Sequence, residues 1–437
     1  MEKEYHLAID IGASSGKSVI GYLKDGKLIN EVIYRFPNAC FEDKEGHKTW
    51  DVNKLFNEVI NSIKAALSKE KNIKTLSIDT WGCDYVLLDE NDEIILPVYS
   101  YRDNRTEDII EQVNSIISKE ELFSLTGSQF QPFNTLYQLY KDKEDGRLKK
   151  AKTFLMIPEY LMFKLTGKKV HEITNASTTN LIEKDKYDYS TEIIEKLGFC
   201  KDLFIKPSKV GTLVGDLLPQ FQKEFNTNII VKLCPTHDTA SCVRFLNNDE
   251  NSLYLSSGTW SLLGTKLDKY FISKDAFTNN FSNELGPNYV RFQKNIMGLW
   301  IIQNLLKEEN DDILNAISLA KDSSYKKIID VNDSSFLNPI NMKEAIMKYL
   351  ENHNLDKPKT KGDLYNLVFI SLAEFYKKTI DDLSKLLNKS FDQIFILGGG
   401  AKNDYLNRLV EEKTKLKVVA YPYECSALGN LLSQCED

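Results

Sequence analysis

Two hydrophobic patterns follow each other along the first eighty residues. Short apolar runs bounded by polar or small residues are typical of strands, and Asp25 and Gly26 form a hairpin turn between two of them. Further along, apolar residues recur every three or four positions, which is typical of the buried face of a helix. We expect strands over residues 5–10, 18–23, 27–34 and 75–78, and a helix that begins near Val52.

A similar order begins again in the second half of the chain. We expect strands over residues 253–256, 261–266, 289–292, 393–397 and 416–420, with a long helix over 363–387 and a short one from Asp404. The repetition favours a duplicated α/β unit. A chain of 437 residues with 42% hydrophobic composition is also too long for one ordinary domain. We therefore expect two domains, 1–245 and 246–437.

Composition limits the partners of the chain. Lys and Arg number 56 against 63 Asp and Glu, a net charge of −7 that favours small molecules over nucleic acid or an anionic membrane. No apolar run approaches the roughly 18 to 20 residues of a membrane span, so we expect a cytoplasmic protein. Seven scattered cysteines indicate reduced, mostly buried thiols rather than disulfides or a zinc site.

Two small-residue loops follow predicted strands. AIDIGASSGK (8–17) and LYLSSGTWS (253–261) offer backbone N–H groups that an anion can approach closely, and together they suit one polyphosphate held between two domains. The first loop is not a Walker loop, because Gly12 lies one residue too close to Gly16 and a strand follows instead of a helix. Three glycines, Gly398–Gly400, offer a similar close approach. Ordinary hairpin and strand-to-helix turns are the alternative interpretation.

The pair His237 and Asp238 follows an apolar strand over residues 229–233, close to the predicted domain boundary. A carboxylate at that place is suited to accept a hydroxyl proton while the oxygen attacks a γ-phosphoryl group. Asp10, at the end of the first strand, is a second carboxylate that is suited to orient water around Mg²⁺. A purely structural His–Asp pair is the alternative.

An aromatic and polar cluster is the last candidate. DTWGCDY (79–85) combines with Asp103, Arg105 and Asn134 to offer stacking faces and hydrogen-bonding groups, which suit a polyhydroxylated ligand. Trp81 is equally compatible with a place in the core.

These motifs resemble the FGGY carbohydrate kinases. The resemblance runs in family order from residue 8 to about residue 430 through the segments AIDIGASSGK, WDV, IDTWGCDYVLLD, YRDNRT, QPFNTLYQL, TNASTTNL, HDTAS, LSSGTWSL, KNIMGLW and GGGAKN. It implies an α/β fold of duplicated ribonuclease H-like domains, as in the actin, hexokinase and Hsp70 superfamily, around an inter-domain ATP cleft.

The resemblance also implies an activity and its residues. It indicates an ATP-dependent enzyme that transfers the γ-phosphoryl group to O1 of L-rhamnulose in rhamnose catabolism, with Asp238 as catalytic base. Carried over by position, the ATP contacts are Ala13, Ser14, Ser15, Gly16, Lys17, Thr259, Gln303 and Gly400. The sugar contacts are Gly82, His237, Asp238, Thr239 and Asn295.

The chain departs from the family pattern at three positions. Lys17 stands where Arg is usual, which exchanges a planar fork for a point charge, and Cys83 replaces a small apolar residue beside Gly82. Cys425 replaces a small alanine, which we expect to affect the packing of the last helix and not the chemistry. A kinase for another ketose, such as fuculose, xylulose or a quorum-signal ketose, is the nearest alternative. A catalytically silent sugar-binding regulator or actin-like assembly protein is another, although neither needs the carboxylate of Asp238.

Overall fold

The chain forms two compact units, each built from segments that are far apart in the sequence. The computed structural model describes residues 3–246, 251–337, 339–421 and 424–436. The first unit comprises Met1–Asn247, Leu267–Arg291 and Glu424–Asp437, and the second comprises Asn248–Lys266 and Phe292–Tyr423. The end of the chain therefore returns to the unit in which the chain begins.

A six-stranded mixed sheet forms the centre of the first unit, with the order β11-β12-β6-β1-β2-β3. The central strands β1, β6 and β12 are parallel, whereas β2, β3 and β11 are antiparallel to their neighbours. The strands span Tyr5–Ile11 (β1), Ser15–Lys24 (β2), Lys27–Pro37 (β3), Ile73–Thr80 (β6), Leu213–Asp216 (β11) and Ile230–Lys232 (β12). The predicted strands of this half are thus confirmed.

The boundary predicted wrongly that bears on the candidate phosphate loop is the start of the second strand. The second strand begins at Ser15 and not at Ser18, so only Gly12, Ala13 and Ser14 form the turn before it. The N–H of Gly12 donates to the carbonyl of Ser15 at 2.9 Å, which closes a tight hairpin. The small residues after this turn belong to β2 and pair with β1 instead of lengthening the loop, because this pairing gives their backbone groups hydrogen bonds.

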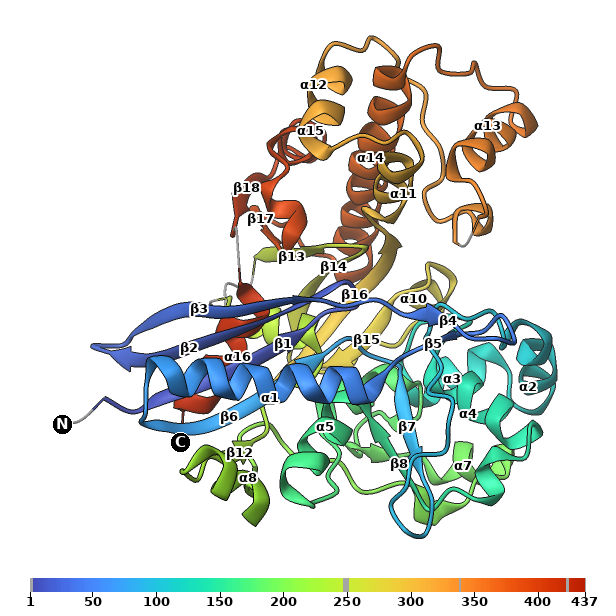
Figure 1. Ribbon diagram of the computed structural model, residues 1–437. Coiled ribbons are helices and arrows are strands. Elements are labelled where there is room, and N and C mark those ends of the chain that lie inside the picture. Colours follow the sequence, from blue (N-terminus) through green and yellow to red (C-terminus); the bar gives the residue numbers. More distant parts are fainter. Residues whose placement is uncertain (1–2, 247–250, 338, 422–423, 437) are drawn as a thin grey trace. The chain divides into compact units, whose positions relative to one another are not determined.

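Two helices cover the opposite faces of this sheet, α1 (Val52–Lys69) and α16 (Cys425–Cys435) (Figure 1). Successive side chains of a strand point to opposite faces. Leu7 and Ile9 of β1 accordingly share a core cluster with residues of α1, whereas Ala8 packs with Ala427 of α16. Asp10 follows the same alternation, so the strand directs its carboxylate toward α16. The predicted helix from Val52 is confirmed.

Smaller elements complete the first unit. Its strand pairs are β4 (Phe41–Glu42) with β5 (Lys48–Thr49), β7 (Tyr85–Leu88) with β8 (Thr153–Met156), and β9 (Ile182–Glu183) with β10 (Asp188–Tyr189). Its remaining α-helices are α2 (Ile110–Ile116), α3 (Lys119–Thr126), α4 (Thr135–Glu144), α5 (Ile157–Thr166), α6 (Ile173–Ala176), α7 (Thr191–Leu197), α8 (Pro219–Phe225), α9 (Asp238–Arg244) and α10 (Lys274–Thr278).

The second six-stranded sheet has the order β15-β16-β14-β13-β17-β18. Its strand β13 is antiparallel to β14 and parallel to β17, just as β1 is antiparallel to β2 and parallel to β6. This repetition confirms the predicted duplication. The strands span Ser252–Ser257 (β13), Trp260–Leu267 (β14), Ser282–Leu285 (β15), Val290–Met297 (β16), Gln393–Leu397 (β17) and Lys417–Ala420 (β18).

In the described part of the second unit the α-helices are α11 (Trp300–Glu308), α12 (Ile313–Lys321), α13 (Met342–Asn352), α14 (Lys361–Leu387) and α15 (Asp404–Thr414). The long helix α14 was predicted with its end at Leu387. It begins at Lys361 because Thr360 and Asp363 form a capping box, in which each side chain accepts a backbone N–H of the other.

The cysteines differ from the expectation in one respect. All seven are free thiols, but only Cys234, Cys242 and Cys425 are buried, so the prediction of mostly buried thiols was wrong. Among the described residues, no helix combines the length and the apolar character that crossing a bilayer requires.

Candidate active site

Three carboxylates gather at one edge of the first sheet. Asp10 ends β1, Asp79 lies near the end of β6, and Asp238 follows β12, and the carboxyl ends of these parallel strands share one edge. Burial raises the pKa of Asp79 well above its usual value, and the charge of Asp10 raises it further. Burial and then the charge of Asp10 raise the pKa of Asp238 to about 7. The three groups therefore feel one another's charge.

Asp238 begins α9, and its side chain retains 30% exposure. The backbone N–H and the hydroxyl of Thr239 donate to Oδ1 at 2.5 and 3.2 Å. In the part of the chain that the structure describes, no protein donor contacts Oδ2. One oxygen is thus held in place while the other is open to a substrate, and a pKa near neutrality suits a group that accepts and returns a proton.

Lys17 lies between Asp10 and a further carboxylate, that of Glu424. Its Nζ lies 2.8 Å from Oδ2 of Asp10 and 3.1 Å from Oε2 of Glu424. Burial alone would lower the pKa of Lys17, but the two carboxylates outweigh it and the pKa is raised. The first predicted ATP loop therefore ends in a firmly charged ammonium group beside Asp10.

The last helix, α16, donates hydrogen bonds to two of these carboxylates. The hydroxyl of Ser426 donates to Asp10, and the amide of Asn430 donates to Oδ2 of Asp79 at 2.6 Å. A Cβ on Gly429 would lie 1.8 Å from the carbonyl oxygen of Ser241 in α9, so only glycine permits this close approach. The effect of Cys425 on the packing of this helix stays a prediction.

Sequence reasoning placed Asp79 in the aromatic cluster and not beside Asp10, and it missed Glu424, Ser426 and Asn430. A signal for the first was present, because the run Thr75–Thr80 alternates polar and apolar residues, and its polar positions share the face that Asp10 occupies on the paired strand. The other three needed the knowledge that the last helix returns to the first sheet, which no local pattern supplies.

The predicted sugar contacts of the first unit lie close together. The N–H of Thr80 donates to the carbonyl of Thr236 at 2.9 Å, so the segment that leads to Gly82 runs beside the segment that leads to His237. A Cβ on Gly82 would meet the hydroxyl oxygen of Thr178 at 2.8 Å, which explains the glycine. His237 is buried, and this burial together with the guanidinium of Arg291 lowers its pKa well below the usual value.

The side chains of the predicted aromatic cluster contact one another and other protein groups. Trp81 is buried and its ring lies 4.3 Å from that of Trp50, which favours the core interpretation for this residue. The indole N–H groups of Trp50 and Trp81 donate to Oδ2 of Asp84 at 2.6 and 2.8 Å. Burial raises the pKa of Asp84 to about 6 although these donors oppose the rise. Asp84 thereby fixes the two rings against each other.

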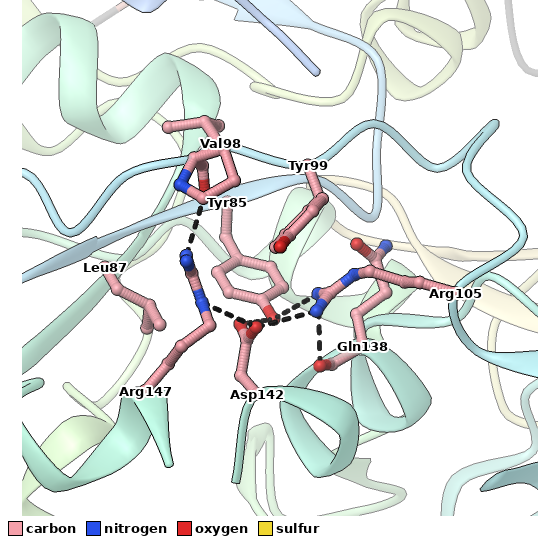
Figure 2. Close-up of a pocket in the computed structure, with 9 residues that line it drawn as sticks. Tyr85, Leu87, Val98, Tyr99, Arg105, Gln138, Asp142 and Arg147 are labelled. Carbon is pink, nitrogen blue, oxygen red and sulfur yellow. Dashed lines mark hydrogen bonds and ion pairs between the residues drawn. The ribbon is translucent and has the colours of Figure 1, made fainter. Parts of the chain in front are cut away.

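Arg105 belongs to a buried ion-pair network (Figure 2). Its Nη1 lies 2.7 Å from Oδ1 of Asp142, and Nε of Arg147 lies 2.9 Å from the same oxygen. The hydroxyl of Tyr85 donates to Oδ2 of Asp142 at 2.5 Å, and the Arg105 guanidinium lies 3.9 Å from the centroid of the Tyr99 ring. These contacts give Arg105 a structural role, not that of a sugar contact.

The two remaining members of the predicted cluster also have protein partners. Asp103 accepts the N–H groups of Lys48 and Arg105 at 2.6 and 2.9 Å. Oδ1 of Asn134 accepts the N–H of Gln131 at 2.8 Å at the start of α4.

Three of the predicted nucleotide contacts, Thr259, Gln303 and Gly400, lie in the second unit, around the turn between β13 and β14. The hydroxyl of Thr259, between β13 and β14, donates to Oε1 of Gln303 in α11 at 3.3 Å. A Cβ on Gly400 would lie 2.0 Å from Oγ of Ser257, so glycine is required where the chain after β17 passes β13. Asn295, predicted as a sugar contact, lies in β16 of the same unit.

Comparisons with known proteins agree with this arrangement. Residues 5–243 match the N-terminal domain of the FGGY family of carbohydrate kinases, and residues 253–435 match its C-terminal domain. The chain is 42% identical to a rhamnulokinase of Oceanobacillus iheyensis, over 99% of this chain and 93% of the relative. It is 37% identical to a rhamnulokinase of Bacillus subtilis, over 98% and 89%.

Solved structures share the fold at low sequence identity. A ligand-bound xylulose kinase from Lactobacillus acidophilus has a TM-score of 0.80 at 17% identity, over 99% of this chain and 89% of that one. A Plasmodium falciparum glycerol kinase with ADP has a TM-score of 0.77 at 15% identity, over the same shares. These likenesses confirm the predicted fold class, and the sequence matches show that this chain belongs to the FGGY family of carbohydrate kinases.

Proposed function

We propose that this protein is an ATP-dependent kinase that transfers the γ-phosphoryl group to O1 of L-rhamnulose and yields L-rhamnulose 1-phosphate and ADP. The observation that carries the proposal is the near full-length similarity, at 37–42% identity, to relatives described as rhamnulokinases. The carboxylate cluster around Asp238 supplies chemistry that fits this reaction.

Asp238 acts as the general base in the proposed reaction. Its oxygen Oδ2 accepts the proton of the sugar hydroxyl as the hydroxyl oxygen forms a bond to the γ-phosphorus, and the bond from phosphorus to the β-phosphate oxygen breaks to release ADP. The hydrogen bonds from Thr239 to Oδ1 keep the carboxylate in position. Lys17 and the backbone from Ala13 to Gly16, in the β1–β2 turn and at the start of β2, stabilise phosphate oxygens.

The acidic cluster fits a hydrated Mg²⁺ ion. Its oxygen donors are hard ligands. Burial and then the charge of Asp10 raise the pKa values of Asp79 and Asp238, and a cation relieves that repulsion between carboxylates. Oδ1 of Asp79 is buried without a hydrogen-bond partner, which leaves an acceptor for a coordinated water. Within the described residues, no three His, Cys, Asp or Glu side chains are placed to chelate a metal directly. Asp10 would hold the ion through water, and the ion would neutralise phosphate charge.

The two halves of the chain have different tasks in this proposal. Residues 1–245 supply the sugar site, the first phosphate loop and the base. Residues 246–437 supply Thr259, Gln303 and Gly400 to the nucleotide and Asn295 to the sugar. A reaction that consumes ATP and a free ketose belongs in the cytoplasm, and it needs no nucleic acid or membrane partner.

A panel of ketoses in an ADP-release assay tests the proposed function. L-rhamnulose, L-fuculose and D-xylulose are compared by kcat/KM at equal ATP and Mg²⁺ concentrations. L-rhamnulose is expected to give the highest value. A higher value for another ketose would refute the substrate assignment, and ADP release with none of them would refute the kinase assignment for this class of sugar.

A further inference from the structure

A buried charged pair stands beside the candidate sugar contact His237. Nη2 of Arg291 lies 3.1 Å from Nδ1 of the His237 ring and also 3.1 Å from Oε2 of Glu284. Arg291 has no solvent exposure, and its Nε donates to the carbonyl of Leu285 at 3.3 Å. A buried arginine is costly unless it is paired, so Glu284 balances its charge and the pair is held in place.

The contact between the guanidinium and the ring fixes where the imidazole carries its proton. A guanidinium group only donates hydrogen bonds, so Nδ1 of His237 has to accept with its lone pair. Glu284 does not compete for a proton on Nδ1, because its oxygen lies 3.6 Å from that atom, beyond a hydrogen bond. In a neutral imidazole one nitrogen accepts and the other donates, so the proton lies on Nε2.

The protonated nitrogen faces the candidate base. Nε2 of His237 lies 3.5 Å from Oδ1 of Asp238, the oxygen that Thr239 already holds. A ligand oxygen that approaches Asp238 thus meets a hydrogen-bond donor from the histidine beside an acceptor from the aspartate. Donor and acceptor side by side distinguish a hydroxyl or carbonyl oxygen from a methylene group at that point of a sugar.

We infer that Arg291 is a positioning residue that holds His237 as its Nε2–H tautomer, so that the ring donates to a sugar oxygen next to the reacting hydroxyl. The sugar part of this inference rests on the proposed function, whereas the tautomer does not. Neither Arg291 nor Glu284 stands out in the sequence, because the pair lies some fifty residues from His237 and only the fold brings the three together.

Nitrogen-15 NMR of the imidazole rings tests the tautomer directly. The His237 signals are assigned by their loss in His237→Gln. In the wild-type protein we expect a protonated Nε2 and an unprotonated, hydrogen-bonded Nδ1. In the double variant Glu284→Leu with Arg291→Met, which removes both charges together and leaves no side-chain donor at either position, Nδ1 loses its donor. The ring is then expected to populate both tautomers.

His171 is the internal control. Its Nε2 donates to the carbonyl of Phe154 at 2.7 Å, and its Nδ1 accepts from the hydroxyl of Tyr189, so the same tautomer is fixed by groups unrelated to Arg291. Its signals should not change in the double variant. A proton on Nδ1 of His237 in the wild type, or a His237 tautomer unaltered by the double substitution, would overturn the inference even if the protein phosphorylated L-rhamnulose.

Steady-state kinetics test the link to the sugar. Loss of one oriented donor to a neutral oxygen is expected to raise the KM for the ketose about tenfold in the double variant, with the KM for ATP changed less than about twofold. Equal rises in both KM values would indicate general damage and refute the role at the sugar. If the wild type phosphorylates no ketose, the proposed function is refuted. The tautomer of His237 is still decided by the NMR measurement alone.

Discussion

The substitution Gly429→Ala tests whether α16 positions the catalytic cluster. A Cβ at this position would lie 1.8 Å from the carbonyl oxygen of Ser241, whereas real Cβ atoms come no closer than about 3.0 Å to such a neighbour. The backbones of α16 and α9 would have to separate by about 1.2 Å. Such overpacking costs about 1–3 kcal/mol of unfolding free energy, and the helix preference of alanine offsets up to about 1 kcal/mol of it.

We expect Gly429→Ala to affect kcat more strongly than the free energy of unfolding. A separation of α16 from α9 moves Ser426 away from Asp10 and Asn430 away from Asp79, or moves Asp238 with its own helix. A displacement of about 1 Å is enough to cost about 100-fold in rate, so kcat in an ADP-release assay is expected to fall by that order.

Gly362→Ala is the matched control. Gly362 lies in α14 of the second unit, and its Cβ would meet the carbonyl oxygen of Leu319 at 2.6 Å, a similar clash between two helices that carry no candidate site residue. This variant should lose stability and keep kcat within about threefold of the wild type. If Gly429→Ala loses stability and still keeps its kcat in the same way, α16 has no positioning role.

Two further predictions concern the pH dependence of stability and the Mg²⁺ requirement of the reaction. The pKa of Asp84 rises from 3.8 to about 6 on folding, so the folded state binds the proton more tightly and stability falls as pH rises through this window. The free energy of denaturant unfolding of the wild type relative to Asp84→Asn should therefore fall by about 2.4 kcal/mol between pH 4 and pH 7, and a constant difference would contradict the buried, titrating carboxyl. Asp10→Asn should raise the Mg²⁺ concentration that gives half-maximal rate, whereas Asp238→Asn should not, and an unchanged requirement in a titration of rate against Mg²⁺ would remove Asp10 from the metal.

Periodicity predicted the elements that carry their own pattern. The strands β1, β6 and β13 and the helices α1 and α14 alternate or repeat over enough residues to be recognised, and the repeated order revealed the duplication. The hairpin at Gly12 was placed with a loop that is too long, because small residues in a strand do not differ in pattern from small residues in a turn.

Contacts between distant segments could not be predicted in this way. Glu424 reaches Lys17 across four hundred residues, and Arg291 reaches His237 across more than fifty. Such pairs depend on how helices and strands pack, and a single sequence contains no record of that packing. Arg105 was assigned to a sugar surface for the same reason, since its partner Asp142 lies on α4 and not in the motif.

The most direct test of the proposed mechanism is the kcat of Asp238→Asn with L-rhamnulose in an ADP-release assay. The substitution keeps size and hydrogen bonding but removes the proton acceptor, and a general base contributes roughly 10²- to 10⁴-fold. We expect kcat to fall by at least about 100-fold, with unchanged thermal unfolding and with calorimetric sugar binding retained. A variant that folds, binds the sugar and keeps more than about a tenth of the wild-type kcat would contradict the assignment of Asp238 as the base.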